Sequence, residues 1–70
     1  MTTSYRILRT SGGNRIASGG ETFAGDELCE AIWLVNMELR AGLPRRERIE
    51  AKRQIAQYEE LLSALRSAEA

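Results

Sequence analysis

Two apolar repeats at helical spacing dominate the second half of the chain and restrict the folds that it can adopt. The first repeat follows intervals of four, three and four residues through Leu28, Ile32, Val35 and Leu39. The second follows intervals of four, three, four and three through Ala51, Ile55, Tyr58, Leu62 and Leu65. Side chains spaced in this way share one face of an α-helix. The sequence therefore predicts two amphipathic helices, over residues 26–41 and 44–67.

The short break between the two repeats predicts how the helices pack. Gly42 is typical of a residue that ends a helix, and Pro44 is tolerated in the first turn of the next one. Between Pro44 and residue 67 no further glycine or proline interrupts the pattern. Helices joined by so short a connection usually fold back on each other. We therefore expect an antiparallel helical hairpin.

Residues 4–23 are typical of a β-hairpin region. β-Branched and aromatic residues are frequent in its first part, and Gly12-Gly13 can supply the positive φ angles of a primed two-residue turn. Two registers are open at this stage. A two-residue loop places Arg9 opposite Ile16, whereas a three-residue loop shifts every pair by one and moves Ile16 to the other face of the sheet.

The segment between the hairpin and the first helix carries a second pair of glycines. Gly19-Gly20 is expected to form a bulge, beyond which residues 21–23 extend the second strand. Asp26 is a good N-cap residue and is predicted to start the first helix. Together these elements predict a single α+β domain over residues 1–70, in which a β-hairpin is followed by an antiparallel two-helix hairpin (ββαα).

The size and composition of the chain indicate how it is stabilised. With 70 residues, a single core supplies roughly 3–5 kcal/mol, and small proteins commonly add a metal, disulfides or a partner chain. The chain has no histidine and a single cysteine, Cys29, so we expect no metal site, no cofactor and no internal disulfide. A homodimer is the expected remaining stabiliser. The longest apolar run, residues 31–35, predicts no membrane span, and we expect a cytoplasmic protein.

The first predicted helix carries more apolar surface than one face can hold. Opposite its repeat lie Cys29, Trp33, Leu34 and Met37. One interpretation is that the strands of the hairpin cover this second face. The other is that it forms a dimer or partner interface, because tryptophan and methionine are enriched at such surfaces. We expect a homodimer in which Trp33 lies at or beside the interface.

Charge sums to zero but is segregated along the chain. Basic residues gather in the hairpin and around the inter-helix turn, where the candidate contacts are Arg6, Arg9, Arg15, Arg45, Arg46, Arg48 and Arg53. Acidic residues gather in residues 21–30 and after residue 54. One interpretation is a solvated helix face with local ion pairs such as Arg46 with Glu50. The other is an anion-binding end that meets an acidic protein, a phosphate or the acidic end of a second subunit.

Few side chains of this sequence are suited to catalysis. There is no histidine, one aspartate and one lysine, and Cys29 has no histidine that could act as its base. The two glycine pairs lack the spacing of a phosphate-binding loop. We therefore expect a protein without enzymatic activity.

Small proteins of this kind are often accessory factors of bacteria or their phages. The leading hypothesis is a protein-binding regulator or inhibitor that blocks a larger host defence or regulatory complex. Both a bacterial and a phage origin are open at this stage, and an anti-CRISPR-like role is one form of this hypothesis. The alternative is a nucleic-acid-binding regulator that uses the same arginines. A structural subunit of an oligomer is the third hypothesis.

Overall fold

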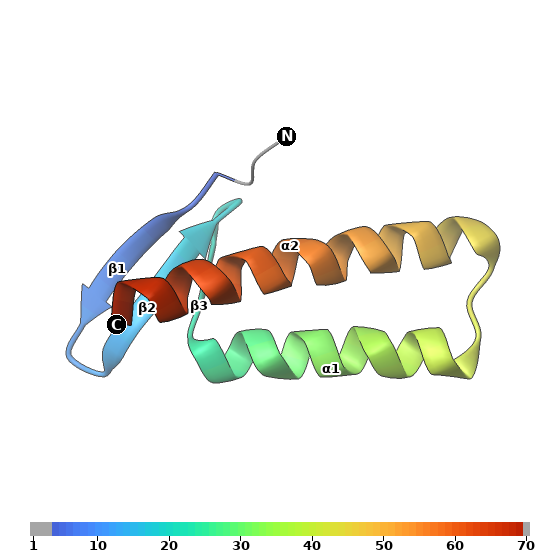
Figure 1. The fold of residues 1–70 in the computed structure, drawn as a ribbon, viewed down its shortest axis with the longest axis horizontal. Coiled ribbons are helices and arrows are strands. Elements are labelled where there is room, and N and C mark those ends of the chain that lie inside the picture. The colour runs from blue at the N-terminus through green and yellow to red at the C-terminus, as the bar shows by residue number, and fades with distance from the viewer. Residues whose placement is uncertain (1–3, 70) are drawn as a thin grey trace.

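The computed structural model describes residues 4–69 as a three-stranded antiparallel sheet followed by two antiparallel helices (Figure 1). The strands are β1 (Arg6–Thr10), β2 (Gly13–Ser18) and β3 (Glu21–Phe23), and they lie in the order β1-β2-β3. The helices are α1 (Gly25–Ala41) and α2 (Arg45–Glu69). This arrangement confirms the predicted α+β class and the order of strands before helices.

The two helices begin and end within two residues of the predicted positions. Gly42 ends α1 with a φ angle of +98°, and its N–H donates to the carbonyl of Leu39 at 3.3 Å. Pro44 is the residue just before α2, which begins at Arg45. The carbonyl of Pro44 accepts the N–H of Arg48 at 2.9 Å, as expected at a helix start. The predicted inter-helix turn is therefore present, and α2 extends further than expected, to Glu69.

The start of α1 differs from the prediction. Asp26 is not the N-cap; that position belongs to Ala24, and the helix begins at Gly25. The carboxylate of Glu27 accepts the N–H of Ala24 at 2.8 Å, which satisfies a backbone donor that a helix start leaves free. Asp26 instead accepts the N–H of Glu27 at 3.0 Å.

The first hairpin has neither of the two predicted registers. Ile7 lies opposite Ile16 and Thr10 opposite Gly13, so the turn is Ser11-Gly12 rather than Gly12-Gly13. Neither Ser11 nor Gly12 has a positive φ angle, so this turn is not of the primed type. The observed register places Ile7 opposite Ile16, where the predicted two-residue loop would have placed Arg9. Pairing of the two isoleucines allows both to pack toward the core.

The second glycine pair forms the primed turn. Gly19 and Gly20 have φ angles of +60° and +82°, and Ser18 lies opposite Glu21. Both central residues of a type I′ turn need positive φ, which glycine adopts without strain. The expected bulge is therefore wrong, and residues 21–23 form a third paired strand.

The core lies where the sheet meets the helices. Its fully buried side chains are Ile16, Leu28, Leu61 and Leu65. Phe23 and Tyr58 close one edge with an edge-to-face ring contact, 5.9 Å between centroids. The sheet packs mainly on α2, through β2, rather than on α1. Away from the sheet, the buried Val35 and Ala51 continue the contact between the two helices.

Candidate functional site

The face of α1 that points away from α2 is uncovered and carries several exposed apolar side chains. We call it the Trp33 surface and define it as Cys29, Trp33, Leu34 and Met37. Trp33 is 59% exposed, Leu34 and Met37 are each 48% exposed, and Cys29 is also exposed. Cys29, Trp33 and Met37 follow one another at intervals of four, so they form one row along the helix. The interpretation that the strands cover this face is wrong, because the sheet packs on α2.

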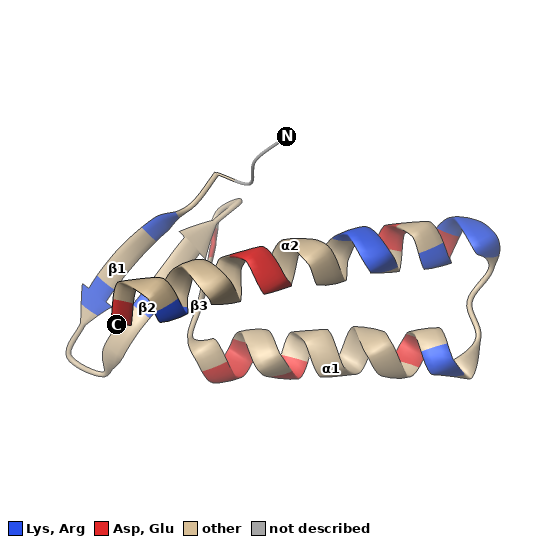
Figure 2. Cartoon of the chain, viewed as in Figure 1, with Lys and Arg blue, Asp and Glu red and all other residues tan. Residues whose placement is uncertain are grey.

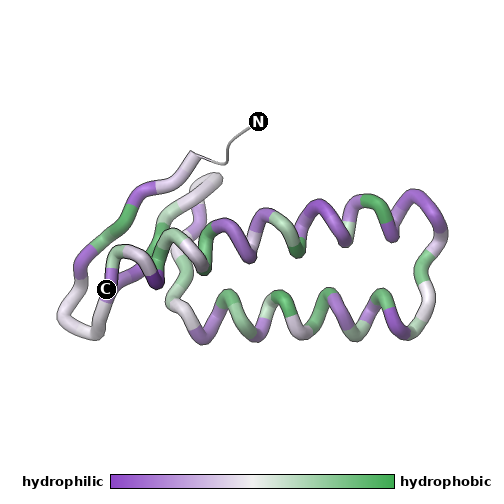
Figure 3. Tube along the Cα trace, in the orientation of Figure 1, coloured by the Kyte–Doolittle hydropathy of each residue, from purple (hydrophilic) through white to green (hydrophobic). Residues whose placement is uncertain are grey.

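The half of α2 nearest the inter-helix turn carries an exposed isoleucine among basic side chains. Hydrophobic residues recur along the whole of α1, whereas this half of α2 is mostly hydrophilic (Figure 3). Ala51 and Ile55 of this half face α1, whereas Ile49 is 48% exposed. The side chains one turn before and after it are Arg45, Arg46, Lys52 and Arg53, all exposed. We call these five residues the Ile49 surface.

Ile49 was not among the predicted contact residues. The signal that could have found it is its spacing, because cationic residues stand three and four positions away on both sides. Arg48, which was predicted, is exposed but lies about 100° round the helix from Ile49. The basic run of the sequence therefore divides over more than one side of α2.

Of the two interpretations of the basic run, the one with local ion pairs is not what the structure has. Within residues 4–69, the side chains of Arg46 and Arg53 form no ion pair with Glu50. Glu50 lies beside Arg46 and Arg53 at the edge of the Ile49 surface, and it lines a surface hollow together with Glu38 and Glu47. The cationic side chains of the Ile49 surface form no ion pair within residues 4–69, and they outnumber this one neighbouring carboxylate.

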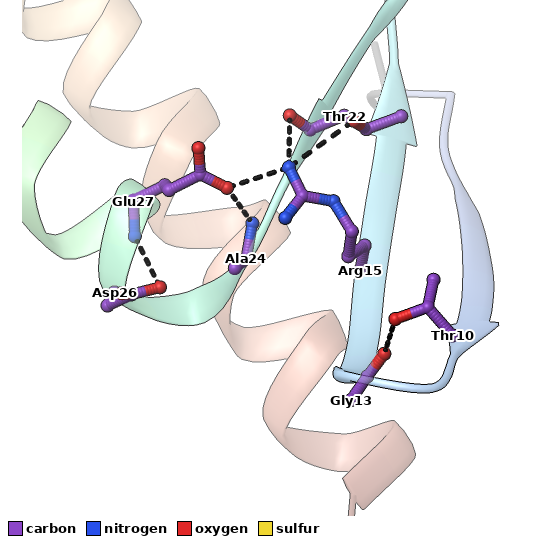
Figure 4. Close-up of polar contacts among 7 residues, drawn as sticks. All are labelled: Thr10, Gly13, Arg15, Thr22, Ala24, Asp26 and Glu27. Atoms are coloured by element: carbon purple, nitrogen blue, oxygen red, sulfur yellow. Dashed lines mark hydrogen bonds and ion pairs between the residues drawn. The ribbon is translucent and has the colours of Figure 1, made fainter.

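Arg15 has a structural role that the sequence did not show. Its guanidinium donates to Glu27 at 2.7 Å and approaches the carbonyl and hydroxyl of Thr22 at 3.3 and 3.4 Å (Figure 4). These contacts join β2 to β3 and to the first turn of α1. Because Glu27 also accepts the N–H of Ala24, one carboxylate ties the sheet to the start of the helix. Arg15 is therefore occupied within the chain.

The other predicted basic residues lie in two separate places (Figure 2). Arg6 and Arg9 are exposed on the edge strand β1, at the sheet end of the molecule. The inter-helix turn and the Ile49 surface lie at the other end, and the molecule is 40 Å long. The hairpin and turn arginines therefore do not form one continuous patch.

Residues 4–69 were compared with the requirements of a metal site and of a membrane-spanning helix. These residues contain no cluster of histidine, cysteine, aspartate and glutamate that could hold a metal ion. Neither of their helices combines the length and the apolar character needed to cross a bilayer.

Comparison of the chain with protein-family models, with curated proteins and with solved structures found no match. Function is therefore inferred from the Trp33 and Ile49 surfaces themselves.

Proposed function

We propose that the protein is a non-enzymatic, cytoplasmic regulator or inhibitor that docks its Ile49 surface onto an acidic surface of a larger protein. The observation that carries this proposal is the exposure of Ile49 among four cationic side chains that have no ion-pair partner within residues 4–69. An apolar side chain flanked by three arginines and a lysine can combine apolar contact with the charge-assisted hydrogen bonds of arginine, a residue enriched at protein interfaces.

The chemistry of the surface favours a carboxylate-rich partner. A guanidinium forms paired, charge-assisted hydrogen bonds with a carboxylate, and its planar shape loses less freedom on binding than an ammonium group. Ile49 would fill an apolar hollow at the centre of the contact, and the surrounding charged rim would shield it from water. Opposite charges would also speed the encounter, most strongly at low salt.

A nucleic-acid partner is less well supported by the same geometry. Phosphate binding draws its affinity from the number of cations that face the backbone together. Here the hairpin arginines lie at the opposite end of the molecule from the Ile49 surface, and the whole chain has no net positive charge. An exposed isoleucine adds nothing to phosphate contact but adds directly to contact with a protein.

The proposed mode of action is steric. A bound molecule 40 Å long would cover a contact site of a larger assembly and keep its normal partner away. This action suits an inhibitor of a host defence or regulatory complex, and a phage-encoded inhibitor is one form of the proposal.

The test is affinity capture from the native host with matched variants. The double reversal Arg46→Glu with Arg53→Glu, and separately Ile49→Ala, should weaken capture of the main partner by roughly tenfold or more. The matched control is Arg6→Glu with Arg9→Glu, which makes the same charge change at the other end and should leave capture intact. Circular dichroism checks that each variant folds.

Two results would overturn the proposal. Capture that is unchanged by both the Arg46/Arg53 reversal and Ile49→Ala would remove the Ile49 surface from binding. Loss of the captured partner after nuclease treatment of the lysate would assign the surface to a nucleic acid instead.

A further inference from the structure

We infer that a second copy of this chain covers the Trp33 surface, with the two α1 helices packed antiparallel across a twofold axis. This surface lies on the side of α1 that faces away from α2, so the inference is independent of the proposed role of the Ile49 surface. The occupant is identified by the order of charged and apolar side chains along α1.

Four residues of α1 form a stripe whose chemistry is complementary to its own reverse. Glu30, Trp33, Met37 and Arg40 follow at intervals of three, four and three, which places them on one side of the helix. Read in one direction the stripe is acid, tryptophan, methionine, base. In an antiparallel pair, each Glu30 meets Arg40 of the second copy and each Trp33 meets Met37 of the second copy.

The charges at the two ends of α1 decide between the antiparallel and parallel arrangements. Asp26 and Glu30 lie in the first turns, and Arg40 lies in the last turn (Figure 2). Within residues 4–69 the side chains of Glu30 and Arg40 have no hydrogen-bond or ion-pair partner, so both are available to a second copy. A parallel pair would bring the acidic ends together and align the two helix dipoles, which is unfavourable. The antiparallel pair opposes the dipoles and joins acid to base.

The register follows from the symmetry of the stripe. A twofold axis at the level of Val35 makes position 30 face position 40 and position 33 face position 37, on both halves of the interface. Such an interface is isologous, so every contact occurs twice. Trp33 would pack against the thioether of Met37 of the second copy, a favourable contact for sulfur and an aromatic ring. Leu34 and Cys29 would lie along the two flanks.

The small core gives the second copy a stabilising role. Only a few side chains are fully buried within the described chain, and they gather at the sheet end. Away from the sheet, Val35 and Ala51 are the only buried side chains among residues 4–69, and both retain some exposure. Covering Trp33 and Met37 would add apolar burial to this thin region. Because α2 lies behind α1, the dimer would also leave both copies of the Ile49 surface exposed, on opposite sides.

Equilibrium sedimentation at micromolar concentration tests the association. The wild-type chain should be a dimer, and Trp33→Ala should raise the dissociation constant at least about tenfold. The matched control is Ile49→Ala, which removes a comparably exposed apolar side chain from α2 and should leave the dimer intact. A wild-type monomer, or a dimer unaffected by Trp33→Ala, would overturn the inference.

Charge exchange and cross-linking test the orientation. Glu30→Arg and Arg40→Glu should each weaken the dimer, and the two together should restore it. In a Cys29→Ser background, Glu30→Cys with Arg40→Cys should form a covalent dimer on mild oxidation. Neither cysteine alone should do so, because equivalent positions would lie roughly 15 Å apart along the axis. A disulfide formed by Glu30→Cys alone would indicate a parallel pair and overturn the inference.

These tests separate the dimer from the proposed function. Loss of partner capture by Ile49→Ala in an intact dimer would support the Ile49 surface alone. Loss of the dimer by Trp33→Ala, with capture retained, would support the Trp33 surface as an interface between copies and leave the proposed function standing.

Discussion

Replacing Ile16 with alanine removes the side chain that joins the sheet to the helices. Ile16 is 0% exposed and packs in the core with Leu28, Leu61 and Leu65. Truncating a buried isoleucine to alanine costs about 2–5 kcal/mol, whereas truncation to valine costs about 0.5–1.5 kcal/mol. A core of this size supplies only about 3–5 kcal/mol in total. We therefore expect Ile16→Ala to be largely unfolded and Ile16→Val to fold with reduced stability.

Urea unfolding followed by far-ultraviolet circular dichroism measures this difference. For so small a chain the free energy of unfolding falls by about 1 kcal/mol for each molar of urea, at the low end of the usual range. The midpoint of Ile16→Val should therefore lie about 0.5–1.5 M below that of the wild type. All variants are compared at one protein concentration, because self-association would make the midpoint depend on concentration.

The control is the same truncation at a solvent-exposed isoleucine. Ile49→Ala removes the same atoms from a half-exposed position, and alanine also favours the helix. Its free energy of unfolding should stay within about 0.5 kcal/mol of the wild type. If Ile16→Ala and Ile49→Ala lowered the midpoint equally, the reasoning that burial of Ile16 holds the sheet on α2 would be refuted.

Two further pairs of variants test local features of the fold. Gly20→Ala should cost about 1–2 kcal/mol, because Gly20 has a φ angle of +82° and an added Cβ would meet nothing, so backbone strain is the whole penalty. Gly12→Ala lacks that strain and should cost far less; equal urea midpoints for the two variants would contradict the primed turn. Glu27→Ala should lower stability by about 0.5–1 kcal/mol, since it removes the contacts to Arg15 and to the Ala24 N–H. Glu27→Gln keeps an oxygen that can accept the Ala24 N–H and should cost less. In thermal melts its loss of stability relative to the wild type should shrink as salt is added, because salt screens the ion pair of the wild type. A loss that is unchanged by salt would count against the ion pair.

The helices were the most predictable part of the fold. Their apolar repeats depend on local periodicity, and the buried Leu28, Val35, Ala51 and Leu65 all belong to the predicted stripes. Leu61 was missed, although it is one of the most buried residues. It lies to one side of the stripe that faces α1 and packs toward the sheet instead. The sequence does not show on which side of α2 the sheet will lie, so it could not assign Leu61 to the core.

The strands were predictable as a class but not in register. The glycine pairs 12–13 and 19–20 look alike, yet only the second forms a primed turn. Turn preference alone favours Gly12-Gly13 as strongly as Gly19-Gly20. Burial of apolar side chains decides the register, because the observed pairing places Ile7 opposite Ile16 and keeps Arg9 in solvent. That choice depends on contact with helices far along the chain.

The candidate surfaces show the same division. Periodicity in the sequence was enough to place Trp33 and Met37 opposite the buried stripe of α1, because side-chain direction on a helix follows from residue number. Whether that face meets the sheet or solvent depended on which helix the sheet packs on, and it packs on α2. The order of charges along the chain likewise located the basic residues, but it did not show which of them form ion pairs within the fold. Only the folded chain pairs Arg15 with Glu27 and leaves Arg46 and Arg53 without an ion pair within residues 4–69, since ion pairs depend on distances that the folded structure creates.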